Sequence, residues 1–133
     1  MPAAAFDGSS TLTLFTMPFV SLDDLNASEK IPGYVGRFVH SETMTMARWE
    51  VEAGRSFPEH SHPHEQFSIV VSGTFELTIE GETEVLDAGR MAVIPADATH
   101  SGQARTDCEI IDVFHPVREE YQNDGAQARP SES

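Results

Sequence analysis

Residues 54–73 read GRSFPEHSHPHEQFSIVVSG and hold three of the six histidines in the chain. Side chains two positions apart on a strand point to the same face of a sheet. His60 and His62 are therefore expected to point together, and His64 joins them if the strand continues. Gln66 keeps the parity of His62 and offers a side-chain oxygen. The stretch therefore predicts a cluster of metal ligands on one face of a strand.

A fourth candidate ligand follows a second block punctuated by glycine and proline, GRMAVIPADATH (89–100), and is its last residue, His100. Histidine is the commonest metal ligand in proteins. Three imidazoles with one side-chain oxygen suit Zn, Fe, Ni, Mn or Co, and the residues do not choose among these ions. We expect a divalent metal ion as the cofactor. The expected ligands are His60, His62, Gln66 and His100.

The sequence leaves the roles of the neighbouring side chains open. Glu65 has the opposite parity to Gln66 and would replace it as a ligand if the strand bulges. His64 is expected at the mouth of the site or in solvent. His40 and His115 have no motif around them, so we expect structural or surface roles for both.

Length and composition indicate one domain, because 133 residues are enough for a single core. No apolar run reaches the roughly 18 residues of a membrane span. The N-terminal stretch MPAAAFDGSS lacks a basic region followed by a long apolar run, so we expect no secretory signal. Cys108 is the only cysteine, which excludes an intrachain disulfide and fits a reducing compartment. We expect a cytoplasmic protein.

The charge of the chain excludes two classes of partner. The formal net charge is −14, and Lys30 is the only lysine. Nucleic acid and anionic membranes both require clustered basic residues, so we expect neither as a partner. A small anionic substrate would need a local positive centre within this acidic protein, and a metal ion supplies one.

The remaining sequence reads as short strands separated by Gly, Pro and Asp. The segment TFELTIE (74–80) alternates apolar and polar residues, as a half-buried strand does. This pattern predicts an all-β antiparallel sandwich or barrel. We expect an N-terminal segment over residues 1–30, a barrel over 31–118 and a polar, flexible tail over 119–133. A short helical turn is expected within 23–29, capped by an aspartate.

The stretch IIDVFHPVRE (110–119) places an aspartate between apolar residues of one strand. Asp112 and Phe114 share a face, and a carboxylate there is costly to bury without a partner. Arg118 is a candidate partner, and its planar guanidinium is also suited to gripping a substrate carboxylate. The alternative is an edge-strand aspartate that faces water, with Arg118 on the surface.

Two motifs now support a family resemblance. The pattern Gly54-x5-His60-x-His62-x3-Gln66-x6-Gly73 resembles the first cupin motif, and Gly89-x5-Pro95-x-Asp97-x2-His100 is similar to the second. The resemblance implies a single-domain cupin, a double-stranded β-helix or jelly-roll barrel. Cupins commonly form dimers by sheet packing, so the resemblance also implies a homodimer. Cupins host many chemistries, so the fold alone assigns no activity.

The chain departs from these motifs at three positions. Gln66 stands where the family usually has Glu, Asp97 where it often has Gly, and Ala104 where it often has Asn. Aspartate tolerates unusual backbone angles, so Asp97 can still form the turn. The neutral Gln66 leaves the charge of a divalent ion uncompensated. That favours an anionic ligand and a metal that polarises an oxygen, and it disfavours oxygen chemistry at iron.

The combination of HSHPHEQ with the C-terminal DVFHPVREEY is similar to the KdgF-type cupins of pectin and alginate breakdown. That resemblance implies a metal-dependent enzyme that opens 4,5-unsaturated uronate monosaccharides to linear keto sugar acids. It assigns Asp112 as the general acid/base, Arg118 as the carboxylate grip and Phe114 as a packing surface for the sugar ring. The alternatives are a binding or sensor cupin without catalysis and, less favoured by Gln66, a metal-dependent dioxygenase.

Overall fold

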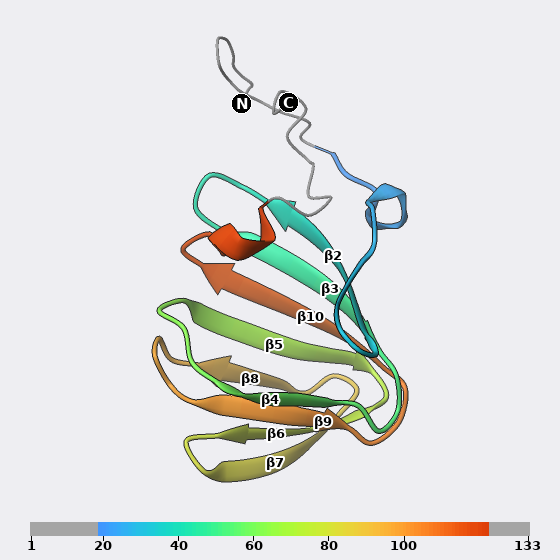
Figure 1. Cartoon of the computed structure of the whole chain (residues 1–133), viewed down its shortest axis with the longest axis vertical. Coiled ribbons are helices and arrows are strands. Elements are labelled where there is room, and N and C mark those ends of the chain that lie inside the picture. The colour runs from blue at the N-terminus through green and yellow to red at the C-terminus, as the bar shows by residue number, and fades with distance from the viewer. Residues whose placement is uncertain (1–18, 123–133) are drawn as a thin grey trace, which may run out of the picture.

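The computed structural model describes residues 19–122, and strands dominate this range (Figure 1). The strands are β1 (Ser28–Ile31), β2 (Tyr34–His40), β3 (Thr45–Val51), β4 (Ser56–His60), β5 (Glu65–Ser72), β6 (Thr74–Ile79), β7 (Glu82–Asp87), β8 (Met91–Ile94), β9 (His100–Ala104) and β10 (Cys108–His115). Two short 3-10 turns, η2 (Leu22–Asp24) and η3 (Glu119–Tyr121), flank them. The expected all-β fold is confirmed.

The strands form two antiparallel sheets that pack face to face (Figure 1). The larger sheet has the order β1-β2-β3-β10-β5-β8, and the smaller has the order β4-β9-β6-β7. Consecutive strands β4 and β5 belong to different sheets, so the chain crosses between the layers at the histidine-rich loop. The ligand candidates therefore lie where the chain passes from one sheet to the other.

Strict alternation of side chains builds the core between the sheets. In β2, β3 and β10 the buried positions alternate with positions that are half-buried or exposed. Phe38, Trp49 and Ile110 point inward and are almost fully buried. The same period of two carries Gln66 and Asp112 inward, because each has the parity of its buried neighbours. The interior between the sheets therefore includes the polar side chains of Gln66 and Asp112.

The ends of the barrel differ from the expected limits. Strand β1 begins at Ser28, before the expected boundary at 31, and η2 follows Ser21 rather than an aspartate cap. Tyr121, placed by sequence in a polar tail, is buried and stacks on Phe38 with ring centroids 4.5 Å apart. An aromatic ring in an otherwise polar segment is what anchors η3. Residues 1–18 and 123–133, where the flexible ends were expected, lie outside the described residues.

Within residues 19–122 there is no helix of the length and apolar character needed to cross a bilayer.

Candidate metal centre

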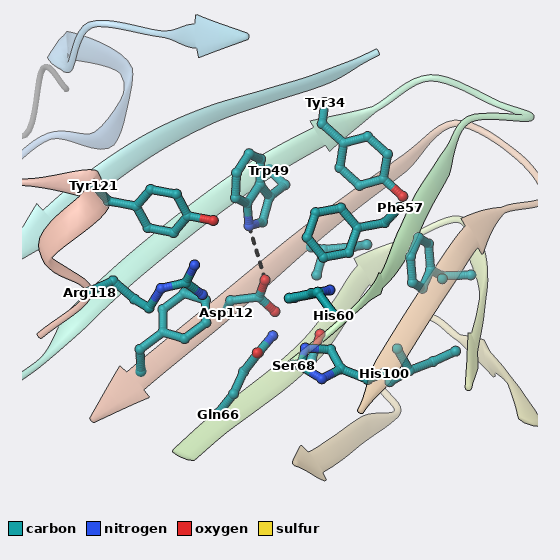
Figure 2. A pocket seen from close by; sticks show the side chains of 15 residues that line it. Tyr34, Trp49, Phe57, His60, Gln66, Ser68, His100, Asp112, Arg118 and Tyr121 are labelled. Atoms are coloured by element: carbon teal, nitrogen blue, oxygen red, sulfur yellow. Dashed lines mark hydrogen bonds between the residues drawn. The ribbon is translucent and has the colours of Figure 1, made fainter. Parts of the chain in front are cut away.

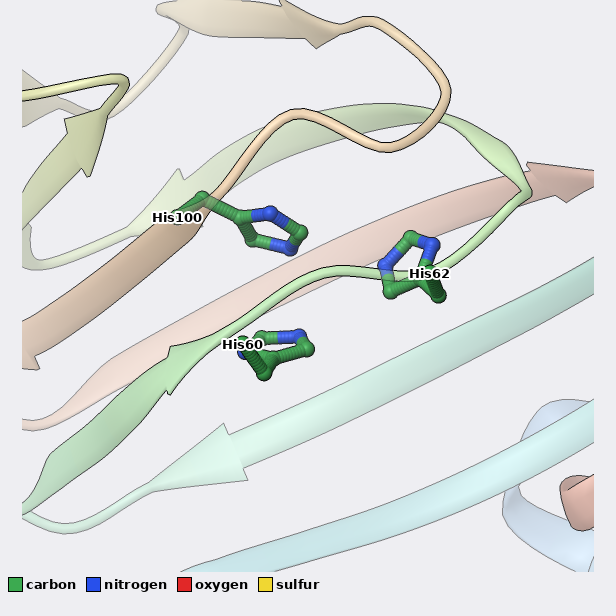
Figure 3. A group of neighbouring side chains, drawn as sticks. All are labelled: His60, His62 and His100. Atoms are coloured by element: carbon green, nitrogen blue, oxygen red, sulfur yellow. The ribbon is translucent and has the colours of Figure 1, made fainter.

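Three histidines converge at one end of the space between the sheets (Figure 3). His60 ends β4, His100 begins β9, and the two are direct partners across the antiparallel pair. Their ring centroids are 4.2 Å apart. His62 lies in the following loop, and its ring centroid is 5.4 Å from that of His60 and 5.0 Å from that of His100. One nitrogen from each ring falls within 4.8 Å of the others.

Backbone carbonyls fix which nitrogen of each ring carries the proton. The Nδ1 atom of His60 lies 3.0 Å from Pro58 O, that of His62 3.1 Å from His64 O, and that of His100 2.9 Å from Ala98 O. A carbonyl oxygen only accepts, so each Nδ1 must be the donor. In the neutral ring the lone pair is then on Nε2. Such a second hydrogen bond is how proteins orient metal-binding histidines.

Two further observations show that the cluster fits a cation. His100 Nε2 is buried and has no hydrogen-bond partner among the described residues. His62 Nε2 faces Gln66 Oε1 at 3.2 Å. With Nδ1 of His62 donating, both of these facing atoms are acceptors, and two acceptors cannot bond to each other. A divalent ion between them satisfies both, so His60, His62, His100 and Gln66 would hold the metal.

The electrostatics of the cluster favour the metal-binding form of histidine. Burial lowers the pKa of His60 and His100 below the usual value. For His62, burial together with the positive charge of Arg118 lowers the pKa to about 4. The rings are therefore neutral near pH 7. Neutral imidazole is the form that ligates a metal, so metal binding at these rings releases no proton from them.

The structure gives the positions of the side chains near the site whose roles the sequence left open. Gln66 points inward and is buried, whereas Glu65 is exposed on the outer face of β5, so the strand does not bulge to bring Glu65 in. His64 is buried rather than solvated, and its Nε2–H donates to Val117 O at 3.1 Å. Asp97 adopts the left-handed conformation, with φ of +69°, as expected for an aspartate in this turn.

Asp112 faces the same interior from β10 (Figure 2). Trp49 Nε1–H donates to Asp112 Oδ2 at 3.0 Å, and Ser68 lies directly opposite Asp112 on β5. Asp112 Oδ1 is buried without a hydrogen-bond partner among residues 19–122. Burial raises the pKa of Asp112 to about 6, although the nearby Ser68 and Gln66 and the Trp49 hydrogen bond act in the opposite direction. The water-facing alternative for Asp112 is therefore excluded.

Arg118 lies between two aromatic rings at the edge of the site (Figure 2). The guanidinium carbon is 4.8 Å from the centroid of Phe114 and 4.6 Å from that of Tyr121. Arg118 was one candidate partner for Asp112, but the ion pair of Arg118 is with Glu120, and Asp112 accepts a hydrogen bond from Trp49 instead. The reason is that Glu120 is two residues away on the same turn.

A buried hydrogen-bond chain holds the turn that carries Arg118. His40 Nε2 contacts Tyr121 O at 3.2 Å, and since a carbonyl only accepts, Nε2 carries the proton. His40 Nδ1 must then accept from Thr45 Oγ1 at 2.8 Å, and Thr45 Oγ1 accepts from the backbone N–H of Arg118 at 2.9 Å. His40 therefore supports this turn, which agrees with the structural role expected for it. His115 is exposed, as expected.

One cavity between the sheets is lined by His60, Gln66, His100, Asp112 and Arg118, together with side chains that sequence reasoning did not single out. Tyr34, Trp49 and Ser68 line it, and the hydroxyl of Tyr34 is buried without a partner among the described residues. Burial raises the pKa of this hydroxyl, so it stays protonated. The signal in the sequence was strand parity, because each of these residues alternates with outward-facing neighbours.

The family model of the cupin domain matches residues 47–114, just over half of the 133 residues. The chain is a cupin. Among solved structures, an RmlC-like cupin from Shewanella frigidimarina has a TM-score of 0.76 at 24% identity, covering 80% of this chain and 96% of that one. The two agree in fold, and the single-domain jelly-roll expected from the motifs is confirmed.

Other relatives differ in how much of each chain is covered. The structure of KdgF from Halomonas sp. has a TM-score of 0.75 at 28% identity and covers 79% of this cupin and 98% of that chain. Polyketide synthase CurC from Streptomyces cyaneus is 40% identical over 63 residues, which is 47% of this chain and 41% of CurC. Protein SchB from Streptomyces halstedii is 35% identical over 66 residues, 49% of this chain and 48% of SchB. This chain thus spans less than half the length of these two curated relatives.

Proposed function

We propose that this cupin is a metal-dependent enzyme that opens the ring of 4,5-unsaturated uronate monosaccharides to give linear keto sugar acids. The observation that carries the proposal is the cavity that brings Asp112 and Arg118 to the three-histidine and glutamine cluster. The similarity to the structure of KdgF, at 28% identity over nearly all of that chain, agrees with the KdgF-type resemblance of the motifs from which this reaction is proposed.

The metal, held by His60, His62, Gln66 and His100, would polarise the sugar oxygens as a Lewis acid. The protein side chains provide the rest. Loss of the proton from the anomeric hydroxyl forms the C1 carbonyl and breaks the bond between C1 and the ring oxygen. The ring oxygen leaves as an enolate, which becomes the keto group when a proton is added to the alkene carbon C4. One proton is removed and one is added, so the reaction is an isomerisation that needs no co-reactant. A single acid/base can perform both transfers in turn.

Asp112 is suited to this double task. Its Oδ2 atom accepts a hydrogen bond from Trp49, Oδ1 has no hydrogen-bond partner among the described residues, and Asp112 lines the cavity. Oδ1 would take the hydroxyl proton and return it to the alkene carbon. Arg118 would bind the uronate carboxylate, and Phe114, which already stacks on Arg118, would pack against the sugar. The aromatic walls and the Tyr34 hydroxyl suit a ring with one charged and several hydroxylated edges.

The test is turnover of an unsaturated uronate by the metal-loaded protein, followed as loss of ultraviolet absorbance. Asp112→Asn should lower kcat by about 10²-fold or more, the usual contribution of a positioned acid/base, with metal content unchanged. Arg118→Lys should mainly raise KM, because lysine lacks the planar fork. Glu109→Gln is the matched control for Asp112→Asn, because Glu109 lies on the same strand with its side chain on the outward face.

A binding or sensor cupin without catalysis is the alternative that this assay tests. The unpartnered polar atoms of the cavity suit a hydroxylated ligand whether or not it reacts. Tight binding of the uronate with no loss of absorbance would select that alternative. Parental rates in both variants would remove the last strand from the active site.

A further inference from the structure

The environment of Arg118 limits how a ligand can reach it. Arg118 is buried, and the rings of Phe114 and Tyr121 lie close to its guanidinium carbon. Stacked rings cover the faces of a guanidinium but leave its N–H groups free at the edges of the plane. A ligand must therefore approach Arg118 along an edge of the guanidinium.

One such edge is only half used. The Nε–H and one Nη–H of arginine form a two-pronged edge that binds a carboxylate through two parallel hydrogen bonds. The carboxylate of Glu120 contacts Nη2 through Oε2. Nε is buried and has no hydrogen-bond partner among residues 19–122. Glu120 thus accepts from Nη2 and leaves the neighbouring Nε–H of Arg118 buried without an acceptor.

Glu120 is exposed enough to exchange with another anion, whereas Arg118 is not exposed enough to lose its partner without a replacement. The Glu120 side chain is 55% exposed, whereas that of Arg118 is 8% exposed. Turning into water would solvate the Glu120 carboxylate but would leave the Arg118 charge buried and unpaired, which is unfavourable. The exchange becomes favourable only when another anion arrives. The ion pair also lowers the pKa of Glu120, so Glu120 is a carboxylate anion. Its displacement by a sugar acid therefore exchanges one anion for another.

We propose that Glu120 is a built-in competitor for the ligand carboxylate: it holds Arg118 in the free protein, and a sugar acid displaces it by bonding to Nε and Nη2 together. This inference rests on the proposed role of Arg118 as the carboxylate grip and deepens it. A neutral sugar cannot replace the lost ion pair, so it would leave Glu120 on Arg118 and its binding would not depend on Glu120.

The chain offers a matched pair of variants for the test. Glu119 and Glu120 are adjacent in η3, but Glu119 is 77% exposed and its carboxylate lies 3.6 Å from His64 Nε2. Glu120→Gln and Glu119→Gln therefore make the same change in net charge at nearly the same place. Glu120→Asp keeps the charge and withdraws the carboxylate by one methylene. Circular dichroism and thermal unfolding verify that all three are folded.

Binding is measured by titration calorimetry of the metal-loaded proteins with D-galacturonate, and with neutral D-galactose as the control ligand. Glu120→Gln and Glu120→Asp should tighten galacturonate binding by about twofold to fivefold, the range of a partly exposed ion pair. Glu119→Gln should change the affinity for galacturonate by less than half as much as Glu120→Gln does. Galactose binding should be the same in all four proteins.

Three outcomes overturn the inference. Weaker galacturonate binding in Glu120→Gln would mean that Glu120 positions Arg118 instead of competing. Equal tightening in Glu119→Gln would assign the effect to net charge. Absence of galacturonate binding in every protein would remove the carboxylate site itself. The assay needs no turnover, so tightening specific to Glu120 without conversion of unsaturated uronates would retain this inference and reject the proposed reaction.

Discussion

At the scale of single residues, the charge of the ligand set distinguishes this site. Three neutral imidazoles and one neutral amide leave a divalent ion with its full charge. Arg118 is close enough to lower the pKa of His62, and it would add a further positive charge once its partner Glu120 is displaced. With a divalent ion bound, a positive centre would lie inside a chain of net charge −14. The proposed uronate substrate would be drawn to this centre although the net charge of the protein opposes its approach.

Gln66→Glu tests this account. The variant should keep the metal, because a carboxylate is a stronger ligand than an amide, and should raise KM for the uronate by about tenfold. A unit charge at close range in a partly buried site is worth on the order of 1–4 kcal/mol, and 1.4 kcal/mol is tenfold. Gln103→Glu, at an exposed position of β9, adds the same charge outside the cavity. A lower KM in Gln66→Glu would contradict the electrostatic argument.

The histidine ligands are tested by metal content and stability. His60→Ala or His100→Ala should lose the ion and the stabilisation that chelators remove from the parent. A metal present at a hundred times its Kd adds about 2.7 kcal/mol, or about 10 °C in Tm for a domain of this size. Elemental analysis and thermal unfolding with and without EDTA measure both effects. His115→Ala, at an exposed histidine, is the control. Undiminished metal in either variant removes that residue from the ligand set.

At the scale of elements, the turns between strands fix the register that brings the ligands together. Gly54 and Gly73 both adopt the left-handed conformation, with φ of +85° and +87°. A Cβ at Gly54 would meet nothing within 4 Å. A Cβ at Gly73 would lie 2.2 Å from Asp107 O and 2.9 Å from Cys108 Cα, because the β5–β6 turn packs against the start of β10. Both motif glycines need backbone freedom, and Gly73 also needs space.

The two alanine variants separate these requirements. Gly54→Ala should cost about 1–2 kcal/mol, the penalty for a left-handed L-residue. Gly73→Ala should cost a further ~1–3 kcal/mol, because the neighbouring backbone must move to relieve the overlap. Urea unfolding of the parent and both variants measures the difference. Equal losses of stability would show that the β5–β6 turn adapts freely and that packing against β10 does not constrain it.

The elements also show which parts of the fold the sequence determines. Strand parity grouped Asp112 correctly with Phe114 on one face of its strand, because a period of two leaves only two choices for each side chain. It left open whether that face turned inward or toward water. Parity could not identify the partner of Asp112. Trp49 reaches it from β3, which is distant in sequence and adjacent in space. Likewise, the pairing of Arg118 with Glu120 depends on the turn η3, for which the polar sequence gave no signal apart from Tyr121.

At the scale of the whole molecule, the outer face of the larger sheet carries a row of apolar side chains. Val93 pairs with Phe67, Phe67 with Val113, and Val113 with Met46, so one apolar row crosses four strands. Val93 is 55% exposed and Phe67 is 44% exposed. Contiguous exposed apolar surface of this kind marks an interaction site. Two copies that meet through this face keep the acidic remainder of their surfaces apart.

We therefore expect a homodimer formed by packing of the larger sheets, an isologous contact in which each copy presents the same rows. Analytical ultracentrifugation should give the dimer mass at micromolar concentration. Phe67→Glu should shift the protein to monomer, because two carboxylates would face an apolar partner without compensation. Thr83→Glu adds the same charge on β7 of the other sheet and should leave the dimer intact. A parent that sediments as a monomer, or a dimer unaffected by Phe67→Glu, would exclude this face as the interface. The histidine cluster lies between the sheets and not on the outer face, so the monomeric variant should retain its metal.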